Sequence, residues 1–182
     1  PDYSGPLARQ FTFEDRDFVL GLTEADKRQV QNLYLAEIAH IDAMLGYLFG
    51  QLKKDGLWND TLVVVFSDHG EEFWEHGRWG HGVTLYDEQL HVPLIIKLPG
   101  QTNASRIPEL ISLADVFATV SAAIGASTAQ AGDSLDLMPL MTGAQARPSR
   151  PYVVSEGGFR EDPWARIPGE PVRRSIRTAD YK

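Results

Sequence analysis

Histidine and acidic residues are concentrated in one short part of this chain. Four of its five histidines lie between positions 69 and 91, namely His69, His76, His81 and His91. The same stretch holds the acidic residues Asp68, Glu71, Glu72, Glu75, Asp87 and Glu88. Imidazole nitrogens and carboxylate oxygens bind divalent metal ions and transfer protons. The cluster therefore indicates metal-dependent or acid–base chemistry.

The segment Ser67-Asp-His-Gly70 places a carboxylate beside an imidazole where an apolar run ends. A tight turn can aim both side chains at one point, whereas a strand would send them to opposite faces. An Asp oxygen with a His nitrogen suits Zn or Mn, and a carboxylate alone also suits Ca or Mg. Asp68 and His69 are therefore candidate metal ligands, with a hydrogen-bonded structural pair as the alternative.

A second imidazole, His81, stands between two glycines, Gly80 and Gly82. Glycines let the backbone come close to a bound anion.

The sequence does not support several other types of site. His69-Gly-Glu-Glu does not continue to a second His as a helical zinc-protease motif does, and neither a phosphate-binding Gly-x-x-x-x-Gly-Lys loop nor a Gly-x-Ser-x-Gly elbow occurs.

The elements around this cluster follow an α/β pattern. We predict a long amphipathic helix from Thr23, which forms a capping box with Asp26, to about Asp55. The apolar run 62–66 predicts a buried central strand, and 92–98 a second strand. A further helix, capped at Ser112, is expected to about Ile124, and a short strand at 152–155. Residues 1–22 show no period and are interpreted as an irregular lead-in.

Composition narrows the class of protein. The chain has 182 residues, no cysteine and a net charge of −8, which predicts one domain and argues against nucleic-acid binding. No apolar run reaches the roughly 18 residues of a membrane span. The absence of cysteine excludes disulfides and thiolate metal sites but leaves the cellular compartment undecided.

Several motifs in order resemble the sulfatases of the alkaline phosphatase superfamily. They are Thr61–Glu71, Glu75-His-Gly77, Gly80-His-Gly82, Leu85–Glu88 and Val92–Ile96. The resemblance implies an alkaline-phosphatase-like α/β sandwich, with a mostly parallel central sheet flanked by helices. It also implies that residues 1–182 form a single domain, the C-terminal portion of a sulfatase-type catalytic domain.

The same resemblance implies a metal-dependent sulfuric ester hydrolase acting on a small-molecule or glycan sulfate ester. Asp68 and His69 would ligate the divalent ion, which is Ca, Mn or Zn. His81 stands where many arylsulfatases have a substrate-contacting lysine and phosphodiesterase relatives a metal-binding histidine. Anion contact, acid catalysis and ligation of a second metal therefore stay open for His81. His76 is expected to be a catalytic residue, either on the substrate side or supporting a metal ligand, with a purely structural role as the alternative. No residue is assigned to another cofactor.

Two family features are expected outside this chain, in a missing N-terminal part of the same domain. They are a pair of Asp ligands and a nucleophile in a Cys/Ser-x-Pro-Ser-Arg motif. Ala146–Arg150 matches only the end of that motif, with Ala at the nucleophile position. We therefore expect this fragment to be inactive alone, and the family setting to be periplasmic or secreted.

Other functions stay open at this stage. Phosphodiesterase, phosphonate monoesterase and phosphoglycerol transferase chemistry are the closest alternatives, because the same superfamily carries them out. A non-catalytic metal- or anion-binding module is the alternative from another class, since no nucleophile is present. A purely structural domain would leave the His and acid cluster without a role.

Overall fold

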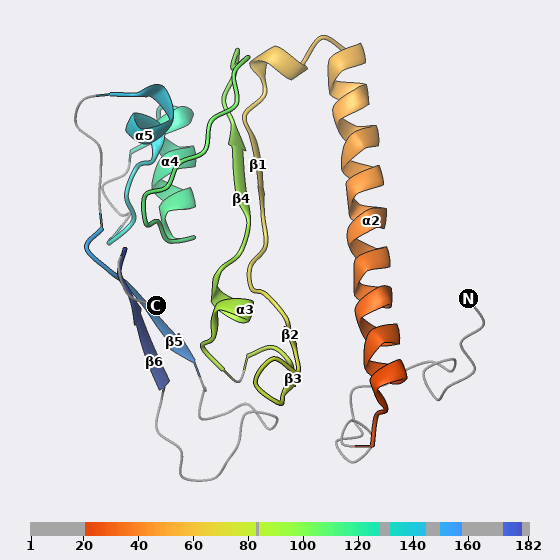
Figure 1. Ribbon diagram of the computed structural model, residues 1–182. Coiled ribbons are helices and arrows are strands. Elements are labelled where there is room, and N and C mark those ends of the chain that lie inside the picture. Colours follow the sequence, from red (N-terminus) through yellow and green to blue (C-terminus); the bar gives the residue numbers. More distant parts are fainter. Residues whose placement is uncertain (1–20, 83, 128–131, 145–149, 158–172, 180–182) are drawn as a thin grey trace. The chain divides into compact units, whose positions relative to one another are not determined.

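The computed structural model describes residues 21–82, 84–127, 132–144, 150–157 and 173–179. The chain divides into two compact units, residues 1–59 and 60–182, each described by itself (Figure 1). Most of the expected lead-in at 1–22 lies outside the described residues. The assignment of 1–182 to one domain stays a prediction.

The first unit contains helix α2, Glu24–Lys54, which confirms the long helix expected from Thr23. The Thr23 hydroxyl accepts a hydrogen bond from the Asp26 amide at 3.3 Å, and the Asp26 carboxylate accepts one from the Thr23 amide at 2.8 Å. This predicted capping box satisfies two amide groups that the first turn leaves without helical partners. A short 3-10 helix, Trp58–Asp60, follows.

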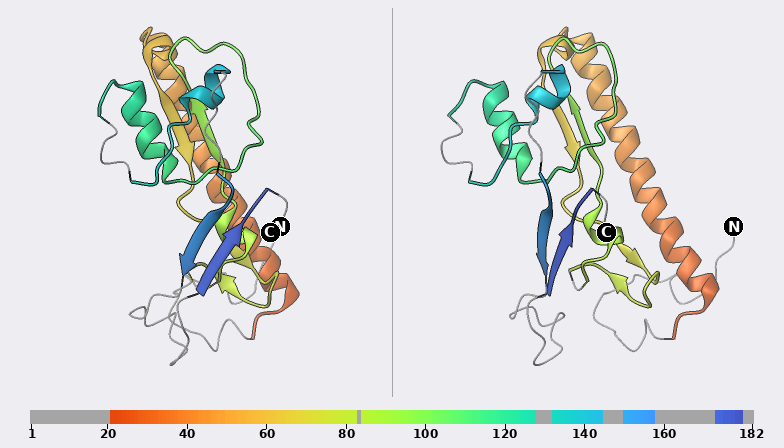
Figure 2. Two further views of the ribbon diagram at one scale, coloured as in Figure 1. Left: turned by 90° about the vertical axis from the view of Figure 1, so that its left-hand side faces the viewer. Right: turned by 60° about the vertical axis from the view of Figure 1, so that its left-hand side comes forward.

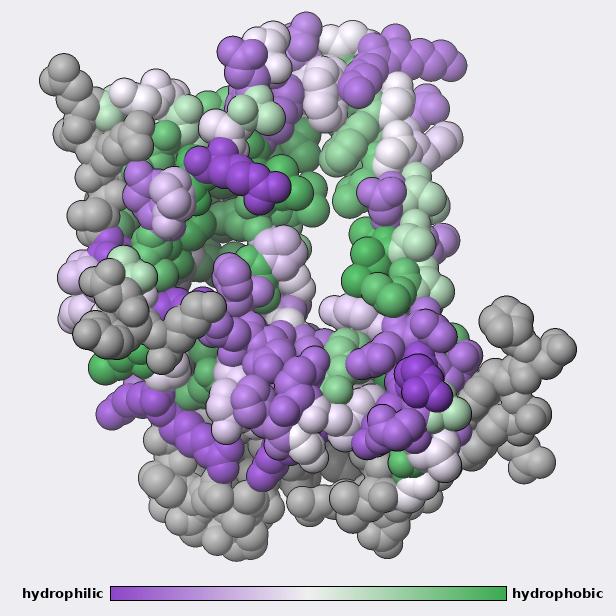
Figure 3. Space-filling view, in the orientation of Figure 1, coloured by the Kyte–Doolittle hydropathy of each residue, from purple (hydrophilic) through white to green (hydrophobic). Residues whose placement is uncertain are grey.

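Helix α2 exposes most of its large apolar side chains. Those with 40% or more of their surface exposed are Leu33, Tyr34, Leu35, Ile38, Ile41, Met44, Tyr47 and Leu48. In the space-filling view hydrophobic atoms line part of this helix (Figure 3). Among the described residues, no helix combines the length and apolar character needed to cross a membrane.

In the second unit, strand β1 (Val63–Phe66) pairs with strand β4 (Leu94–Lys97) in register Val64↔Ile96. Both strands were expected, and both are shorter than their apolar runs. The pair is antiparallel, as are the two other strand pairs in the described part of the chain. The expected mostly parallel pairing is therefore not found in these residues, because apolar residues on both faces indicate burial and do not encode strand direction.

Burial of these two strands also differs from the expectation. Val63 to Val65 are half-buried, and Phe66 and Ile95 are exposed at 47% and 63%. A run that is apolar on both faces does predict a covered strand, but the neighbour that covers it need not lie among the described residues. The expectation of a buried central strand is wrong for this structure.

The remaining elements of the second unit are short. They are β2 (Glu72–Phe73), β3 (Trp79–Gly80), α3 (Asp87–Leu90), α4 (Asp115–Ala123), α5 (Met138–Thr142), β5 (Val153–Gly157) and β6 (Arg173–Arg177). Helices α4 and α5 contact each other, and Ala118, Leu137 and Leu140 are the buried apolar residues of the described chain. Strands β5 and β6 form a separate antiparallel pair (Figure 2).

A buried ion pair organises the start of α4. Asp115 is fully buried and accepts hydrogen bonds from the amides of Ser112 and Leu135, at 2.8 and 2.7 Å, and from the Arg150 guanidinium. Helix α4 begins at Asp115 and not at Ser112, because the carboxylate of Asp115 caps the preceding turn. Arg150, which closes the motif-like Ala146–Arg150 stretch, is thus a structural partner of Asp115.

One ion pair ties the β5–β6 strand pair to α3. Both carboxylate oxygens of Asp87 lie 2.5 Å from Nη2 of Arg177. Gly157 packs against Leu85, so closely that a Cβ at Gly157 would lie 2.8 Å from that side chain. The β5–β6 strand pair is therefore anchored beside the loop that leads into α3.

Candidate metal centre

The turn after β1 is held by short local hydrogen bonds. The Ser67 hydroxyl donates to the His69 carbonyl at 2.6 Å, and the Gly70 amide donates to the Gln89 carbonyl at 2.8 Å. A Cβ at Gly70 would lie 1.8 Å from the Glu88 carbonyl oxygen. The turn therefore needs glycine at position 70, because backbone atoms of α3 occupy the space of any side chain.

This turn brings Asp68 and His69 to one side, as the sequence predicted. Oδ1 of Asp68 lies 3.8 Å from Nε2 of His69 and accepts a hydrogen bond from the His69 amide at 3.0 Å. A separation of 3.8 Å is too long for a hydrogen bond. It suits two ligands of one ion, because metal–ligand bonds of about 2.0–2.2 Å place such atoms about 3–4 Å apart. The two side chains are 84% and 44% exposed.

A small hairpin delivers His81 to the same place. Strand β2 pairs with β3 in register Glu72↔Gly80 and Phe73↔Trp79, so continuing the register by one residue sets Glu71 opposite His81. The connecting turn has positive φ at Trp74 and Gly77, 70° and 75°, and the Trp74 amide donates to the Arg78 carbonyl at 2.7 Å. Opposed residues of an antiparallel pair bring their side chains into contact.

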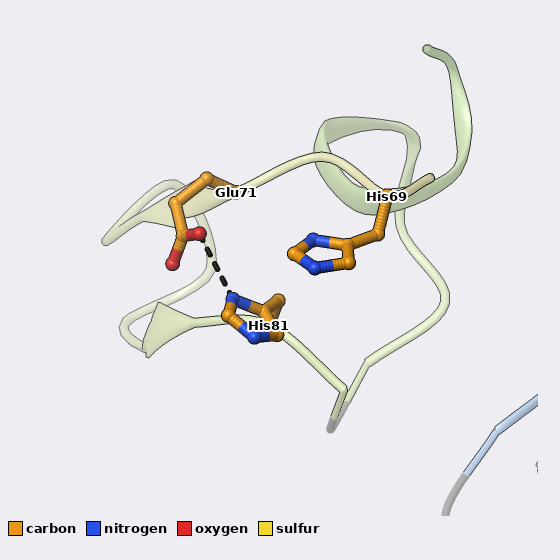
Figure 4. Close-up of side chains that lie close together, drawn as sticks. All are labelled: His69, Glu71 and His81. Atoms are coloured by element: carbon orange, nitrogen blue, oxygen red, sulfur yellow. Dashed lines mark hydrogen bonds and ion pairs between the residues drawn. The ribbon is translucent and has the colours of Figure 1, made fainter. Parts of the chain in front are cut away.

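His69, Glu71 and His81 form a compact cluster (Figure 4). Each offers one ligand atom, and the three atoms all lie within 4.8 Å of one another. The two imidazole rings stack with centroids 3.9 Å apart, and Nδ1 of His81 lies 2.9 Å from Oε2 of Glu71. Two nitrogens and a carboxylate oxygen, with the Asp68 carboxylate adjacent, are a donor set that suits a borderline divalent ion.

His76 belongs to a different group of side chains. Its Nδ1 lies 3.3 Å from Oε1 of Glu88, and its ring stacks on Tyr86 with centroids 3.6 Å apart. The imidazole is 41% exposed. The structure thus brings Asp68, His69 and His81 together, while His76 is held by α3 and the residue before it.

A buried polar network lies on the other face of β2. The Glu72 carboxylate is fully buried, and its Oε2 accepts hydrogen bonds from Thr84 Oγ1 at 2.8 Å and from Gln89 Nε2 at 3.2 Å. Gln89 Oε1 in turn accepts a hydrogen bond from the Gly82 amide at 2.9 Å. This network fixes the backbone that follows His81. Within the described part of the chain, Oε1 of Glu72 has no hydrogen-bond partner.

Two functional features were not assigned from the sequence. Glu71 and Glu72 were included in the acidic cluster, but neither received a role. Their roles depend on pairings across 10 residues, from Glu71 to His81, and 17 residues, from Glu72 to Gln89. One feature of the sequence did indicate the first of these pairings. The segment Trp74–Gly77 contains a glycine, which permits the turn that closes a hairpin.

Comparisons with known proteins identify one matching family and several relatives of this chain. The Sulfatase family model matches residues 4–126. A multifunctional alkaline phosphatase superfamily protein, PehA of Trinickia caryophylli, is 36% identical over 77% of this chain and 27% of its own length. Mouse arylsulfatase K is 30% identical over 74% of this chain and 25% of its own length.

Solved structures give the same result for the fold. Phosphonate monoester hydrolase from Silicibacter pomeroyi matches with a TM-score of 0.65 and 30% identity, over 75% of this chain and 27% of that chain. A sulfatase-like protein of Bacteroides thetaiotaomicron matches with a TM-score of 0.66 at 22% identity, over 86% of this chain and 33% of its own. These matches confirm the alkaline-phosphatase-like fold class. The chain spans about a quarter to a third of the length of these relatives.

Proposed function

We propose that this chain, which belongs to the sulfatase family, is the metal-binding part of a hydrolase that cleaves sulfate esters. The observation that carries the proposal is the cluster at the end of β1. Ligand atoms of His69, Glu71 and His81 lie within 4.8 Å of one another, and the Asp68 carboxylate lies 3.8 Å from His69 Nε2. Sulfatases generally use a divalent metal ion.

In this proposal Asp68 and His69 hold the divalent ion, which is Ca, Mn or Zn. When bound, the ion polarises the ester oxygens and offsets their charge. His81 is 47% exposed and lies against His69, so its imidazole contacts the anionic group of an ester at that position. His76, held by Glu88 and Tyr86, contributes to the substrate side of the same loop region.

Sulfate esters are the first candidate substrates, and phosphonate monoesters are the second. Arylsulfatase K supports the first at 30% identity. The phosphonate monoester hydrolase from Silicibacter pomeroyi supports the second, also at 30% identity. The two ester classes can share a leaving group and differ at the sulfur or phosphorus centre, so contacts to the transferred group are proposed to select between them.

The nucleophile is proposed to come from a part of the protein outside these 182 residues. The chain spans 25% to 27% of the length of its two relatives named above. The site described above supplies a metal-binding group and imidazoles, but no cysteine. By analogy with the family, the protein is proposed to work in the periplasm or outside the cell.

The test uses the intact protein with p-nitrophenyl sulfate and a p-nitrophenyl phosphonate monoester as substrates. Wild-type protein is expected to hydrolyse at least one of them, to lose the activity on treatment with a chelator and to regain it with one of Mn²⁺, Ca²⁺ or Zn²⁺. Asp68→Asn and His69→Ala are expected to lower the affinity for that ion. They should also lower kcat/KM by about 100-fold or more, because in this proposal both residues bind the ion directly.

His40→Ala is the matched control, because His40 is an exposed histidine on α2 and outside the cluster. It should leave metal affinity and activity unchanged. Full activity of the Asp68→Asn and His69→Ala variants, or activity of wild-type protein that survives chelation, would show that this cluster is not the metal site.

A further inference from the structure

The first step concerns which nitrogen of His69 faces outward. Nδ1 of His69 lies 2.8 Å from the carbonyl oxygen of Gly70. A carbonyl oxygen only accepts hydrogen bonds, so Nδ1 of His69 carries the proton and donates. Nε2 is then left for a ligand. Metal-binding histidines usually have this arrangement, in which the second ring nitrogen donates to a carbonyl or a carboxylate.

His81 has the same arrangement with a different acceptor. Its Nδ1 lies 2.9 Å from Oε2 of Glu71, and an ionised carboxylate also only accepts. Nδ1 of His81 therefore carries its proton whether the ring is neutral or charged, and Nε2 is again the free nitrogen. The two rings, stacked 3.9 Å apart, are each fixed through Nδ1.

Exposure separates the two partners of the Glu71–His81 pair. The Glu71 side chain is 16% exposed and the His81 side chain 47% exposed. The carboxylate is therefore the more buried partner and the imidazole the more exposed one. The β2–β3 register sets the two residues opposite each other.

We propose that Glu71 is a positioning residue, which fixes the Nδ1–H tautomer and the orientation of His81 so that Nε2 faces the anionic group of an ester bound beside the ion that Asp68 and His69 hold. This inference rests on the function proposed above for that ligand site. In this inference Glu71 acts through His81. The alternative is that Glu71 itself ligates the metal, since its oxygen lies within 4.8 Å of both histidine ligand atoms.

The test reads the His81 ring directly. In the intact, metal-free protein with ¹⁵N-labelled histidine, the Nδ1 and Nε2 shifts report which nitrogen carries the proton, and a His81→Asn sample assigns the signals. Wild type is expected to show the Nδ1–H form. Glu71→Leu should lose that form as the dominant one, and Glu71→Gln should keep it, because the Gln oxygen accepts at the same place.

Glu88→Leu is the matched control, because Glu88 holds His76 in the same way at 3.3 Å. This variant should change the ring signals of His76 and leave those of His81 unchanged. A Glu71→Leu protein whose His81 signals equal those of wild type would overturn the proposal. So would a His81 change of the same size in Glu88→Leu.

Calorimetry with Mn²⁺ alone, and then with inorganic sulfate added to the Mn²⁺-loaded protein, separates positioning from ligation. Glu71→Leu is expected to weaken sulfate binding about 10- to 100-fold, as the loss of an orienting partner does, while Glu71→Gln restores it. Loss of Mn²⁺ binding in Glu71→Gln as large as in His69→Ala would make Glu71 a ligand and overturn the proposal.

Failure of the proposed function gives a different result. Asp68→Asn and His69→Ala proteins that bind Mn²⁺ as wild type does would refute the metal site. The ¹⁵N signals of His81 in the metal-free Glu71 variants would still report whether Glu71 sets the tautomer. The two hypotheses are thus decided by separate measurements.

Discussion

At the scale of single residues, substitutions of His81 distinguish metal ligation by this side chain from its contact with the ester. His81→Gln is expected to lower kcat/KM by about 100-fold, in the range lost with a proton-transferring or anion-contacting side chain. It should change Mn²⁺ affinity by no more than a few-fold, since in the proposed site Asp68 and His69 hold the ion. His81→Lys should retain more activity than His81→Gln, because an ammonium group also contacts an anion. Steady-state kinetics and calorimetry measure the two quantities.

The opposite pattern would give His81 a different role. A loss of Mn²⁺ affinity in His81→Gln equal to that in His69→Ala would make His81 a metal ligand. His40→Gln, on the exposed surface of α2, controls for the loss of an imidazole elsewhere.

The Asp115–Arg150 pair gives a prediction of how stability depends on pH. Burial raises the pKa of Asp115, but hydrogen bonds from Arg150 and the Leu135 and Ser112 amides outweigh burial and hold the pKa below its ordinary value of 3.8. A lowered pKa in the folded state stabilises the protein above the unfolded-state pKa, and this contribution is lost as the pH falls through the lower folded-state value. Urea unfolding of wild type should therefore show a loss of stability as the pH falls below about 4.

Arg150→Met tests the source of that contribution. Removing the guanidinium leaves a buried carboxylate without its charged partner, which is expected to cost about 3–5 kcal/mol of unfolding free energy at pH 7. The difference between wild type and the variant should shrink as the pH falls below about 4. A difference that is constant from pH 7 to pH 3 would show that the ion pair does not set the pH dependence.

At the scale of elements, the close contact between the His69 turn and α3 can be tested at Gly70. A Cβ there would lie 1.8 Å from the Glu88 carbonyl oxygen, so Gly70→Ala must move backbone. We expect it to lower the unfolding free energy by about 1–3 kcal/mol, the usual cost of overpacking, and to weaken Mn²⁺ binding, because Asp68 and His69 lie on the displaced turn. Thermal unfolding and calorimetry measure both effects.

Gly46→Ala is the matched control. Gly46 lies within α2, and apart from its chain neighbours and the backbone of its own helix no atom of the described residues lies within 4 Å of the position its Cβ would take. The added methyl group should raise the unfolding free energy by roughly 0.5–1 kcal/mol, because alanine favours the helix over glycine. Equal effects of the two substitutions would contradict the steric account of Gly70.

Local patterns predicted the elements that carry a strong local signal. The capping box at Thr23 and the β-branched run before Ser67 led to α2 and β1, whose bounds lie close to those expected. Strand β6 was not predicted, because its sequence Arg-Arg-Ser-Ile-Arg is poor in strand-forming residues and it depends on pairing with β5. Strand direction also could not be predicted, since an apolar run carries no information about its neighbour.

The candidate site, like the fold, was predictable from the sequence only where the signal is local. Asp68 and His69 are adjacent in sequence, so a turn was enough to predict that they face one point, and their 3.8 Å separation agrees with it. The partner of His81 could not be predicted, because Glu71 meets it only through the β2–β3 register. Nothing in the residue types alone distinguishes Glu71 from Glu72, although Glu71, just before β2, pairs with His81 and Glu72, within β2, joins a buried network.

At the scale of the whole molecule, large apolar side chains remain exposed on both units. Besides those of α2, they include Phe66, Ile95 and Phe117, at 47%, 63% and 56%. Exposed apolar surface of this kind is normally covered by another part of a protein or by a partner. The chain spans 27% of PehA and 25% of arylsulfatase K.

The purified 182-residue chain alone is therefore expected to bind Mn²⁺ more weakly than the intact protein and to hydrolyse no p-nitrophenyl sulfate. The physical reason is that the described cluster supplies ligands and imidazoles, whereas ester cleavage in this family's chemistry also needs a positioned nucleophile. Positioning itself contributes several kcal/mol to catalysis, so mixing the chain with small nucleophiles should not restore turnover. The intact protein in the same assay is the control. Turnover by the chain alone, abolished by a chelator, would show that these residues contain a complete active site.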